Sequence, residues 1–354
     1  MIDTSTIPGS LARPVPVPTA IVPCPRPIPR GPLTSWVLAV LDGHDVPAPA
    51  EAGRLDDPLT GDDFHLALHV LYELAYRGVE GTPDSYETHL PLLAFRQELE
   101  DAFERALRAT TSVPAHGTAG ARIDELLGRP AGTSLSSWML EHAGIDEVRE
   151  FAVHRSAYQL KEADPHSWAL PRLAGRRKAA LVEIQMDEYG NGRFGEGHAE
   201  VFAALMRALG LEDRYGAYLD RLPGVTLATG NLISMLGLQR RLAPALLGHL
   251  AVFEMTSVEP MSRYAALCDR LGLPTAVRRF YEVHVEADDH HGRLARDVLI
   301  GGDTEADGLP AGEVAFGAAA LMDVERRMTE HLLTGWTGRS STLCIAPGSP
   351  PSGC

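Results

Sequence analysis

Two histidines and an aspartate lie on one predicted helical stripe in the C-terminal half of the chain. The stretch Tyr281-Glu-Val-His-Val-Glu-Ala-Asp-Asp-His-His291 places His284, Asp288 and His291 at spacings of four and three residues. Because an α-helix turns about 100° per residue, these side chains fall within about 60° of one another. Two imidazoles and a carboxylate are costly to bury without a partner, and this ligand set suits iron or manganese better than zinc.

A glycine-rich stretch separates two predicted helices, residues 173–189 and 196–210, and a carboxylate and an imidazole flank it. Glu188 lies at the end of the first helix and His198 in the first turn of the second. A glutamate at a helix C-terminus opposes the helix dipole, which favours a functional role. A tight turn would let both side chains point into one interior. Glu183 precedes Glu188 by five residues and faces elsewhere, so it competes only weakly as a ligand.

A third carboxylate closes the preceding helical segment, just before Asp164-Pro165. Glu162 is the best candidate there, and Asp164 is the alternative on spacing grounds. The candidate ligands are then three carboxylates and three histidines: Glu162, Glu188, His198, His284, Asp288 and His291. This set is large enough for two metal ions, because carboxylates can bridge two cations and offset their charge.

The order of these six residues resembles the ligand pattern of the heme-oxygenase-like diiron oxidases and oxygenases, also called iron-containing redox enzymes. The flanking sequence at residues 154–166 and 182–190 resembles that family as well, and the resemblance extends from about residue 33 to 341. The resemblance implies a seven-helix heme-oxygenase-like core that binds two ferrous ions rather than heme. It also implies that O2 is the co-substrate.

The resemblance further implies how the ligands divide between the two irons. Glu162, His198 and His291 would hold one ion, and Glu188, His284 and Asp288 would hold the other. Some family members use a further carboxylate just before the histidine of the second ligand helix. The nearest carboxylate here is Glu196, while Gly195 occupies the position three residues before His198, so a seventh ligand stays open.

The glycine-rich stretch Gly190-Asn-Gly-Arg-Phe-Gly195 also spells the G-x-G-x-x-G dinucleotide fingerprint. That fingerprint needs a preceding strand and a parallel sheet, whereas residues 178–189 are rich in helix formers. We interpret the glycines as turn residues between two helices.

Composition excludes several classes of partner. The chain has 354 residues, a net charge of −15 and a pI of about 5.4. Its densest basic run, residues 172–178, is short and lies among apolar residues, so we expect no nucleic-acid or anionic-membrane partner. No apolar stretch approaches the roughly 20 residues needed to span a bilayer. The four cysteines have no metal-finger spacing, and we expect a reduced, cytoplasmic protein without a signal peptide.

The apolar spacing predicts an all-α protein. Helical patterns begin at about residue 33, and no alternating strand pattern interrupts them. Besides the two helices that flank the glycine-rich stretch, the predicted helical segments cover residues 60–78, 89–110, 134–142, 145–162, 212–221, 226–242, 244–257, 260–271, 273–299 and 311–334.

We divide the chain into three parts. Residues 1–32 contain nine prolines and predict an extended arm, for which disorder is favoured over docking. We expect residues 33–336 to form one helical metal-binding domain, with its N-terminal helices wrapped around the bundle. Residues 337–354 are rich in Ser, Gly and Pro and predict a flexible tail.

The leading functional hypothesis is a non-heme diiron oxidase or oxygenase with a small-molecule substrate. The resemblance spans N-oxygenation and oxidative C–C cleavage of amino-acid-like or fatty-acid-like molecules, and leaves the reaction open. An external electron donor and a homodimer also stay open. The alternatives are a helical scaffold or partner-binding protein with a vestigial metal site, and a cofactor-free oxidase on the same fold.

Overall fold

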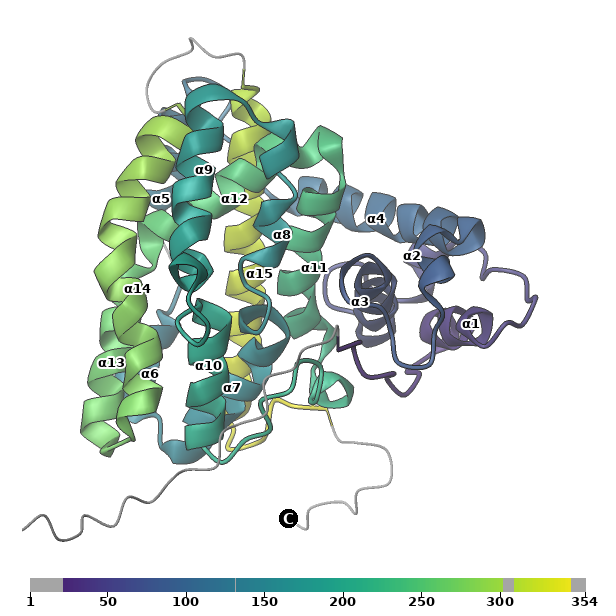
Figure 1. Cartoon of the computed structure of the whole chain (residues 1–354), viewed down its shortest axis with the longest axis horizontal. Coiled ribbons are helices and arrows are strands. Elements are labelled where there is room, and N and C mark those ends of the chain that lie inside the picture. The colour runs from purple at the N-terminus through teal and green to yellow at the C-terminus, as the bar shows by residue number, and fades with distance from the viewer. Residues whose placement is uncertain (1–21, 131, 302–308, 345–354) are drawn as a thin grey trace, which may run out of the picture.

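Helices dominate the computed structural model, which describes residues 22–130, 132–301 and 309–344. The N-terminal helices form a layer at one side of a larger bundle (Figure 1). This layer contains the 3-10 helix η1 (Asp84–Thr88) and the helices α1 (Pro32–Leu41), α2 (Ala52–Leu55), α3 (Asp62–Tyr76) and α4 (Leu90–Thr110).

The bundle holds the remaining helices, which run side by side in Figure 1. They are α5 (Ala119–Leu127), α6 (Leu135–His142), α7 (Ile145–Gln159), α8 (Asp164–Ser167), α9 (Gly175–Glu188), α10 (His198–Ala208), α11 (Gly224–Leu238), α12 (Ala243–Thr256), α13 (Val258–Leu271), α14 (Thr275–Leu294) and α15 (Ala311–Thr337). Short turns of other helix types connect them: η2 (Leu170–Arg172), η3 (Gly190–Gly192), η4 (Leu219–Arg221), η5 (Arg240–Leu242) and the π-turn η6 (Ala295–Leu299).

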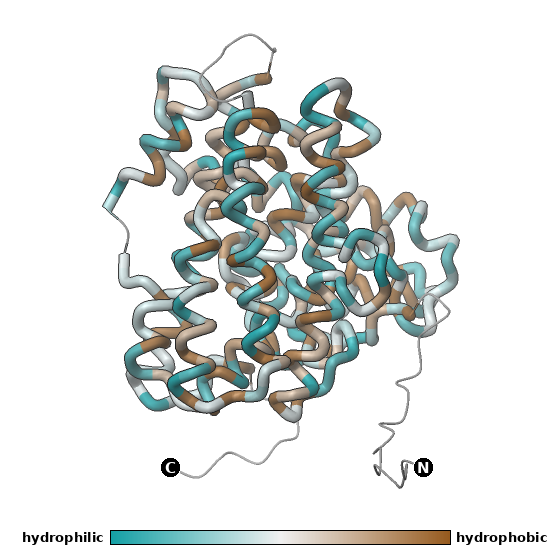
Figure 2. The backbone as a smooth tube through the Cα atoms, turned by 60° about the vertical axis from the view of Figure 1, so that its left-hand side comes forward, coloured by the Kyte–Doolittle hydropathy of each residue, from teal (hydrophilic) through white to brown (hydrophobic). Residues whose placement is uncertain are grey.

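Helices α12 and α15 cross with their backbones in contact at the centre of the bundle. A Cβ atom added at Gly248 would collide with the carbonyl oxygen of Val314, and one added at Gly317 would collide with that of Ala245. Apolar and polar residues alternate around the bundle helices (Figure 2), as expected for helices that bury one side. Met235 and Leu236 of α11 are fully buried in the core.

The predicted all-α class is confirmed, with local corrections. Among the described residues the one strand-like feature is an isolated bridge between Cys24 and Val79. Helix α7 ends at Gln159 rather than Glu162, and the helix expected at 273–299 changes to a π-turn after Leu294. Helices α2 and α5 are not among the predicted segments.

The helix predicted at residues 212–221 is wrong, because this segment forms turns that end in η4. Gly216 has φ +77, and a Cβ there would lie 2.6 Å from Pro25 Cδ. The chain therefore turns at Gly216, where the proline-rich arm lies against it.

The arm packs on the body over its described part. Cys24 is 1% exposed, and its amide donates to Gly78 O at 3.0 Å. Arg30 donates to the carbonyl oxygens of Leu219 and Leu222 at 2.8 and 2.6 Å. Residues 22–31 thus follow the docking alternative rather than the disordered one, and residues 1–21 lie outside the described chain.

A buried ion pair joins the N-terminal layer to the bundle. Lys161 Nζ lies 2.5 Å from Glu73 Oε1 of α3, and the two side chains are 3% and 0% exposed. Tyr215 Oη donates to the same carboxylate oxygen at 2.6 Å. The layer is therefore held at the residue that directly precedes Glu162.

The C-terminal segment after α15 also packs on the bundle, although the sequence predicts a flexible tail. Thr342 is 5% exposed, and its amide donates to Glu150 Oε1 at 2.7 Å. The buried His154 lies between two hydroxyls, with Nδ1 2.7 Å from Thr226 Oγ1 and Nε2 2.8 Å from Thr342 Oγ1. Residues 338–344 are thus fixed by side chains of α7 and α11, and residues 345–354 lie outside the described chain.

A His154→Gln variant is expected to lose less stability in acid than the wild type. Burial is the main cause that lowers the pKa of His154 from 6.5 to about 3. Between these two pKa values the unfolded chain binds a proton at residue 154 and the folded chain does not. The free energy of unfolding therefore falls as the pH drops from about 6.5 toward 3. Between pH 7.5 and 5.0 this group alone removes about 2 kcal/mol. Urea unfolding at both pH values measures the difference, and equal losses in the two proteins would contradict the assignment.

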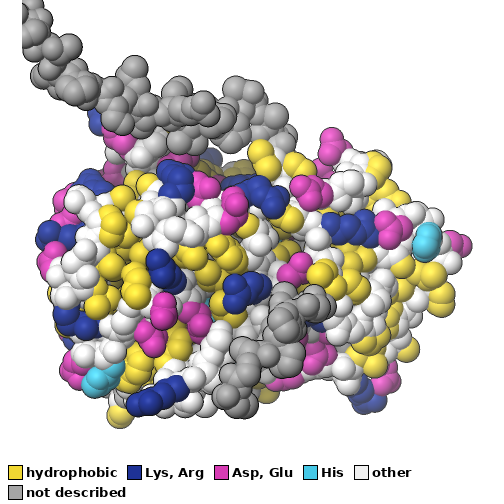
Figure 3. Space-filling model, turned by 90° about the horizontal axis from the view of Figure 1, so that it is seen from below, with side chains coloured by type: hydrophobic (Ala, Val, Ile, Leu, Met, Phe, Trp, Pro, Cys, Tyr) yellow, Lys and Arg dark blue, Asp and Glu magenta, His cyan; other side chains and the backbone are white. Residues whose placement is uncertain are grey.

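The surface mixes charges of both signs on the face shown in Figure 3, where basic and acidic side chains are interspersed. Every helix in the described part of the chain is too short or too polar to cross a membrane.

Candidate metal centre

Carboxylates and imidazoles from five segments converge inside the bundle. Two adjacent groups form, Glu162 with His198 and His284, and Glu188 with Glu254 and His291. Within each group, one potential ligand atom per residue lies within 4.8 Å of the others. The sequence-predicted stripe on α14 therefore meets the other predicted ligands, as the hypothesis requires.

The turn between α9 and α10 brings Glu188 and His198 together. Gly190 has φ +61, and a Cβ there would collide with the backbone amide of Gly197. Only glycine allows the chain to close so tightly. As a result Glu188 Oε2 lies 3.0 Å from His198 Nδ1, and the two side chains are 10% and 5% exposed.

The ring of His284 is oriented by its own helix. Its Nδ1 lies 2.7 Å from the carbonyl oxygen of Phe280, so Nδ1 carries the proton and donates. The lone pair of Nε2 is then directed toward Glu162, whose Oε2 is 3.7 Å away. The rings of His284 and His198 have centroids 4.3 Å apart.

His291 is oriented in the same manner by a carboxylate. Its Nε2 lies 2.9 Å from Asp187 Oδ2 and donates to it. Nδ1 is left to face Glu254 Oε2 at 3.5 Å and Asp288 Oδ1 at 3.8 Å. A histidine that donates one ring nitrogen to a carboxylate and offers the other is the usual arrangement of a metal-ligating imidazole.

Glu254 of α12 belongs to the centre, although it is absent from the sequence-predicted set. A close crossing of α12 and α14 places it there, since a Cβ at Gly292 would lie 3.0 Å from Glu254 O and 3.3 Å from Met255 Cα. The signal in the sequence is that Glu254 is the one charged side chain in an otherwise apolar helix, histidine aside. It is 6% exposed.

Four atoms of the centre are buried without a hydrogen-bond partner. They are Glu188 Oε2, His198 Nδ1, His284 Nε2 and His291 Nδ1. The short distance between Glu188 and His198 does not have hydrogen-bond geometry. Buried polar atoms normally have partners, because leaving one unpaired costs about 1–3 kcal/mol. Converging lone pairs on carboxylate and imidazole fit cations, so these residues fit the metal that the sequence predicts.

The pKa values show how strongly the centre attracts positive charge. Burial and the neighbouring carboxylates Asp288 and Glu188 raise the pKa of Glu254 to about 7. Burial also raises the pKa of Asp288 to about 6. Burial opposes protonation of His284, but the nearby carboxylate of Glu162, followed by those of Glu188 and Asp288, outweighs burial and raises the pKa of His284 to about 10. The raised pKa values mean that Glu254, Asp288 and His284 bind protons readily. A metal cation could replace these protons.

Of the other residues considered from the sequence, Asp288 lies at the centre, and Glu196, Asp164 and Glu183 have partners elsewhere. Asp288 lies beside the second group, near His291. Glu196 is an exposed residue that pairs with Arg193, so it lies apart from the centre. Asp164, the alternative to Glu162, accepts a hydrogen bond from Tyr189 Oη instead. Glu183 pairs with His290 at the surface.

The division between two ions differs from the one implied by the resemblance. The geometry groups His284 with Glu162 and His198, and it groups His291 with Glu188 and Glu254. His284 and His291 lie seven residues apart on α14, which is about two helical turns. His284 faces Glu162, whereas His291 faces Glu254.

The fold and the centre define an all-helical protein with a buried cluster of carboxylates and imidazoles that could hold metal ions. A family model described as iron-containing redox enzyme matches residues 149–326, which is half of the chain. The chain belongs to this family, and the resemblance and the heme-oxygenase-like fold are confirmed. Its class is therefore that of an oxidoreductase.

Among curated proteins, the nitrosourea synthase of Streptomyces achromogenes subsp. streptozoticus is 27% identical over 149 residues. The match covers 42% of this chain and 32% of the relative, so the chain spans about a third of that protein.

Two solved structures of a CADD-like protein of unknown function from Nostoc punctiforme are 17% identical to this chain. They have TM-scores of 0.49 and 0.47 and cover 61% and 62% of this chain, and 96% and 95% of their own.

Proposed function

We propose that the protein is a non-heme diiron oxidase or oxygenase that uses O2 to oxidise a small organic substrate. The observation that carries the proposal is the pair of adjacent ligand groups with four buried, unpartnered ligand atoms. Glu162, His198 and His284 would hold one ferrous ion, and Glu188, Glu254 and His291 the other, with Asp288 close to the second. When bound, the irons would supply the electrons and the binding site that activate O2.

The protein's own groups would fix the ligands and balance their charge. Phe280 O and Asp187 hold the tautomers of His284 and His291, so each ring presents a lone pair to the centre. Four carboxylates, Glu162, Glu188, Glu254 and Asp288, would offset the charge of two ferrous ions. Glu188 lies close to residues of both groups and is the best placed to contact both ions.

Loading the metal-free protein with Fe(II) under anaerobic conditions tests the proposal. We expect about two irons per chain and, on exposure to air, O2 uptake and spectral change faster than for the same Fe(II) without protein. Zinc-loaded protein is the control, because Zn(II) has no accessible redox chemistry. Failure to retain iron, or oxidation no faster than that of free Fe(II), would overturn the proposal. An added reductant that increases O2 uptake would support an external electron donor.

A further inference from the structure

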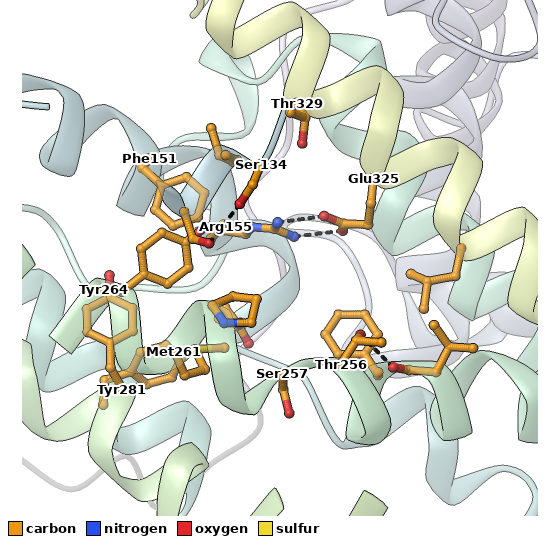
Figure 4. Close-up of a pocket in the computed structure, with 18 of the residues that line it drawn as sticks. Ser134, Phe151, Arg155, Thr256, Ser257, Met261, Tyr264, Tyr281, Glu325 and Thr329 are labelled. Atoms are coloured by element: carbon orange, nitrogen blue, oxygen red, sulfur yellow. Dashed lines mark hydrogen bonds and ion pairs between the residues drawn. The ribbon is translucent and has the colours of Figure 1, made fainter. Parts of the chain in front are cut away.

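A cavity of about 270 Å³ lies beside the candidate metal centre. Its walls come from α7, α10, α12, α13, α14 and α15 and from the start of α6. Figure 4 shows a close-up of the residues that line the cavity.

Two residues that line the cavity contact candidate ligands. Gln159, in its hydrogen-bonding amide orientation, donates to both carboxylate oxygens of Glu162 at 2.6 and 2.8 Å. The ring centroid of Phe280, which also lines the cavity, lies 4.6 Å from that of His284. A molecule in the cavity would therefore lie next to the metals.

An ion pair forms another part of the cavity wall. Arg155 donates to both oxygens of Glu325, at 2.8 and 2.6 Å, in the two-bond arrangement drawn in Figure 4. The side chains are 15% and 27% exposed. Burial alone would lower the pKa of Arg155, but Glu325 outweighs burial and keeps the guanidinium charged.

Apart from this pair, the described lining is uncharged. Aromatic rings such as Phe151, Tyr264 and Tyr281 form much of it, and Ser134, Thr256 and Thr329 add hydroxyl groups. Behind the wall, Arg263 contacts Ser136 Oγ but is itself paired with Glu259. The charges at the cavity therefore sum to zero, and each one already has its counter-ion.

A ligand with net charge would lose its hydration in this cavity and find no free counter-charge. We infer that the cavity is the substrate site and that it selects an uncharged molecule, with an apolar or aromatic body and a hydrogen-bonding group, because Arg155 and Glu325 neutralise each other. The inference names the substrate class of the proposed function and rests on it. The four carboxylates of the centre would likewise leave two bound ferrous ions without net charge.

Three probes with one carbon skeleton test this charge selection: 4-phenyl-1-butanol, 4-phenylbutanoate and 4-phenylbutylamine. Binding is measured by calorimetry at pH 7.5, with full-length protein that is metal-free and with anaerobic Fe(II)-loaded protein. We expect the alcohol to bind at least ~10-fold more tightly than the anion or the cation in both preparations. Binding to metal-free protein separates this inference from the iron chemistry, which can fail independently.

Single neutralising variants should then reverse the selection. Glu325→Gln frees the charge of Arg155 and should raise affinity for 4-phenylbutanoate about 10-fold, and Arg155→Gln should do the same for 4-phenylbutylamine. The double variant Arg155→Met/Glu325→Met is uncharged, so it should keep the preference for the alcohol even if the single variants fold poorly.

Ala152→Trp is the control for location, because Ala152 lines the cavity and is 3% exposed. Filling the cavity should abolish binding of all three probes. The inference is overturned if no probe binds the wild type, if a charged probe binds as tightly as the alcohol, or if binding survives Ala152→Trp.

Discussion

A His284→Ala/His291→Ala variant is expected to retain no tightly bound iron. Each group would lose an imidazole whose free lone pair is buried and fixed by a hydrogen bond on the opposite nitrogen. Removing groups that only orient metal ligands already costs about 10–100-fold in affinity, so losing the ligands themselves should cost more. Anaerobic dialysis against Fe(II) followed by elemental analysis gives the number of irons per chain.

Single carboxylate variants refine this test. Glu254→Ala should lower bound iron from about two to about one per chain, because it removes a ligand from one group only. Glu196→Ala is the matched control and should bind as much iron as the wild type, since Glu196 pairs with Arg193 at the surface. Equal iron in the wild type and the double histidine variant would refute the metal centre. A larger loss for Glu196→Ala than for Glu254→Ala would refute the assignment of the ligands.

Glu73→Ala is expected to destabilise the protein by about 3–5 kcal/mol, because it leaves the ammonium group of Lys161 buried without a partner. Burial alone would raise the pKa of Glu73, but the charge of Lys161, followed by His69 and by hydrogen bonds from Lys161 and Tyr215, lowers it. The carboxylate is thus held ionised by groups that it in turn stabilises. Thermal unfolding of the metal-free protein measures the loss.

Two controls separate a buried pair from an ordinary one. Glu51→Ala removes a carboxylate that pairs with Arg54 while both side chains are exposed, so its effect should be within about 1 kcal/mol. The double variant Glu73→Leu/Lys161→Met removes both charges and should recover much of the stability lost in Glu73→Ala. Similar unfolding temperatures for Glu73→Ala and Glu51→Ala would show that the buried pair contributes little.

The helices could largely be predicted from the sequence because the period of apolar residues is a local property. The predicted segment 89–110 agrees with α4 to within one residue. The failures have non-local causes. Residues 212–221 turn at Gly216 because the arm lies against them, and a contact between distant segments leaves no periodic signal.

The candidate ligands also differ in whether local sequence or tertiary packing determines their position. His284 and His291 could be identified because their spacing on one helix is fixed by helix geometry. The charge of Glu254 in an apolar helix indicates a buried carboxylate, but it does not indicate the neighbour of that carboxylate. The approach of Glu254 to His291 depends on the crossing of α12 and α14 at Gly292. The grouping of ligands likewise depends on how each helix is rotated about its axis, which packing determines.

Lys161 immediately precedes Glu162, and its partner Glu73 lies upstream of the segment that the family model matches, residues 149–326. A fragment limited to that segment would leave the ammonium group of Lys161 without its partner, next to the candidate iron ligand Glu162. The N-terminal layer therefore stabilises the segment that carries Glu162, and recombinant forms of the protein should begin ahead of α3.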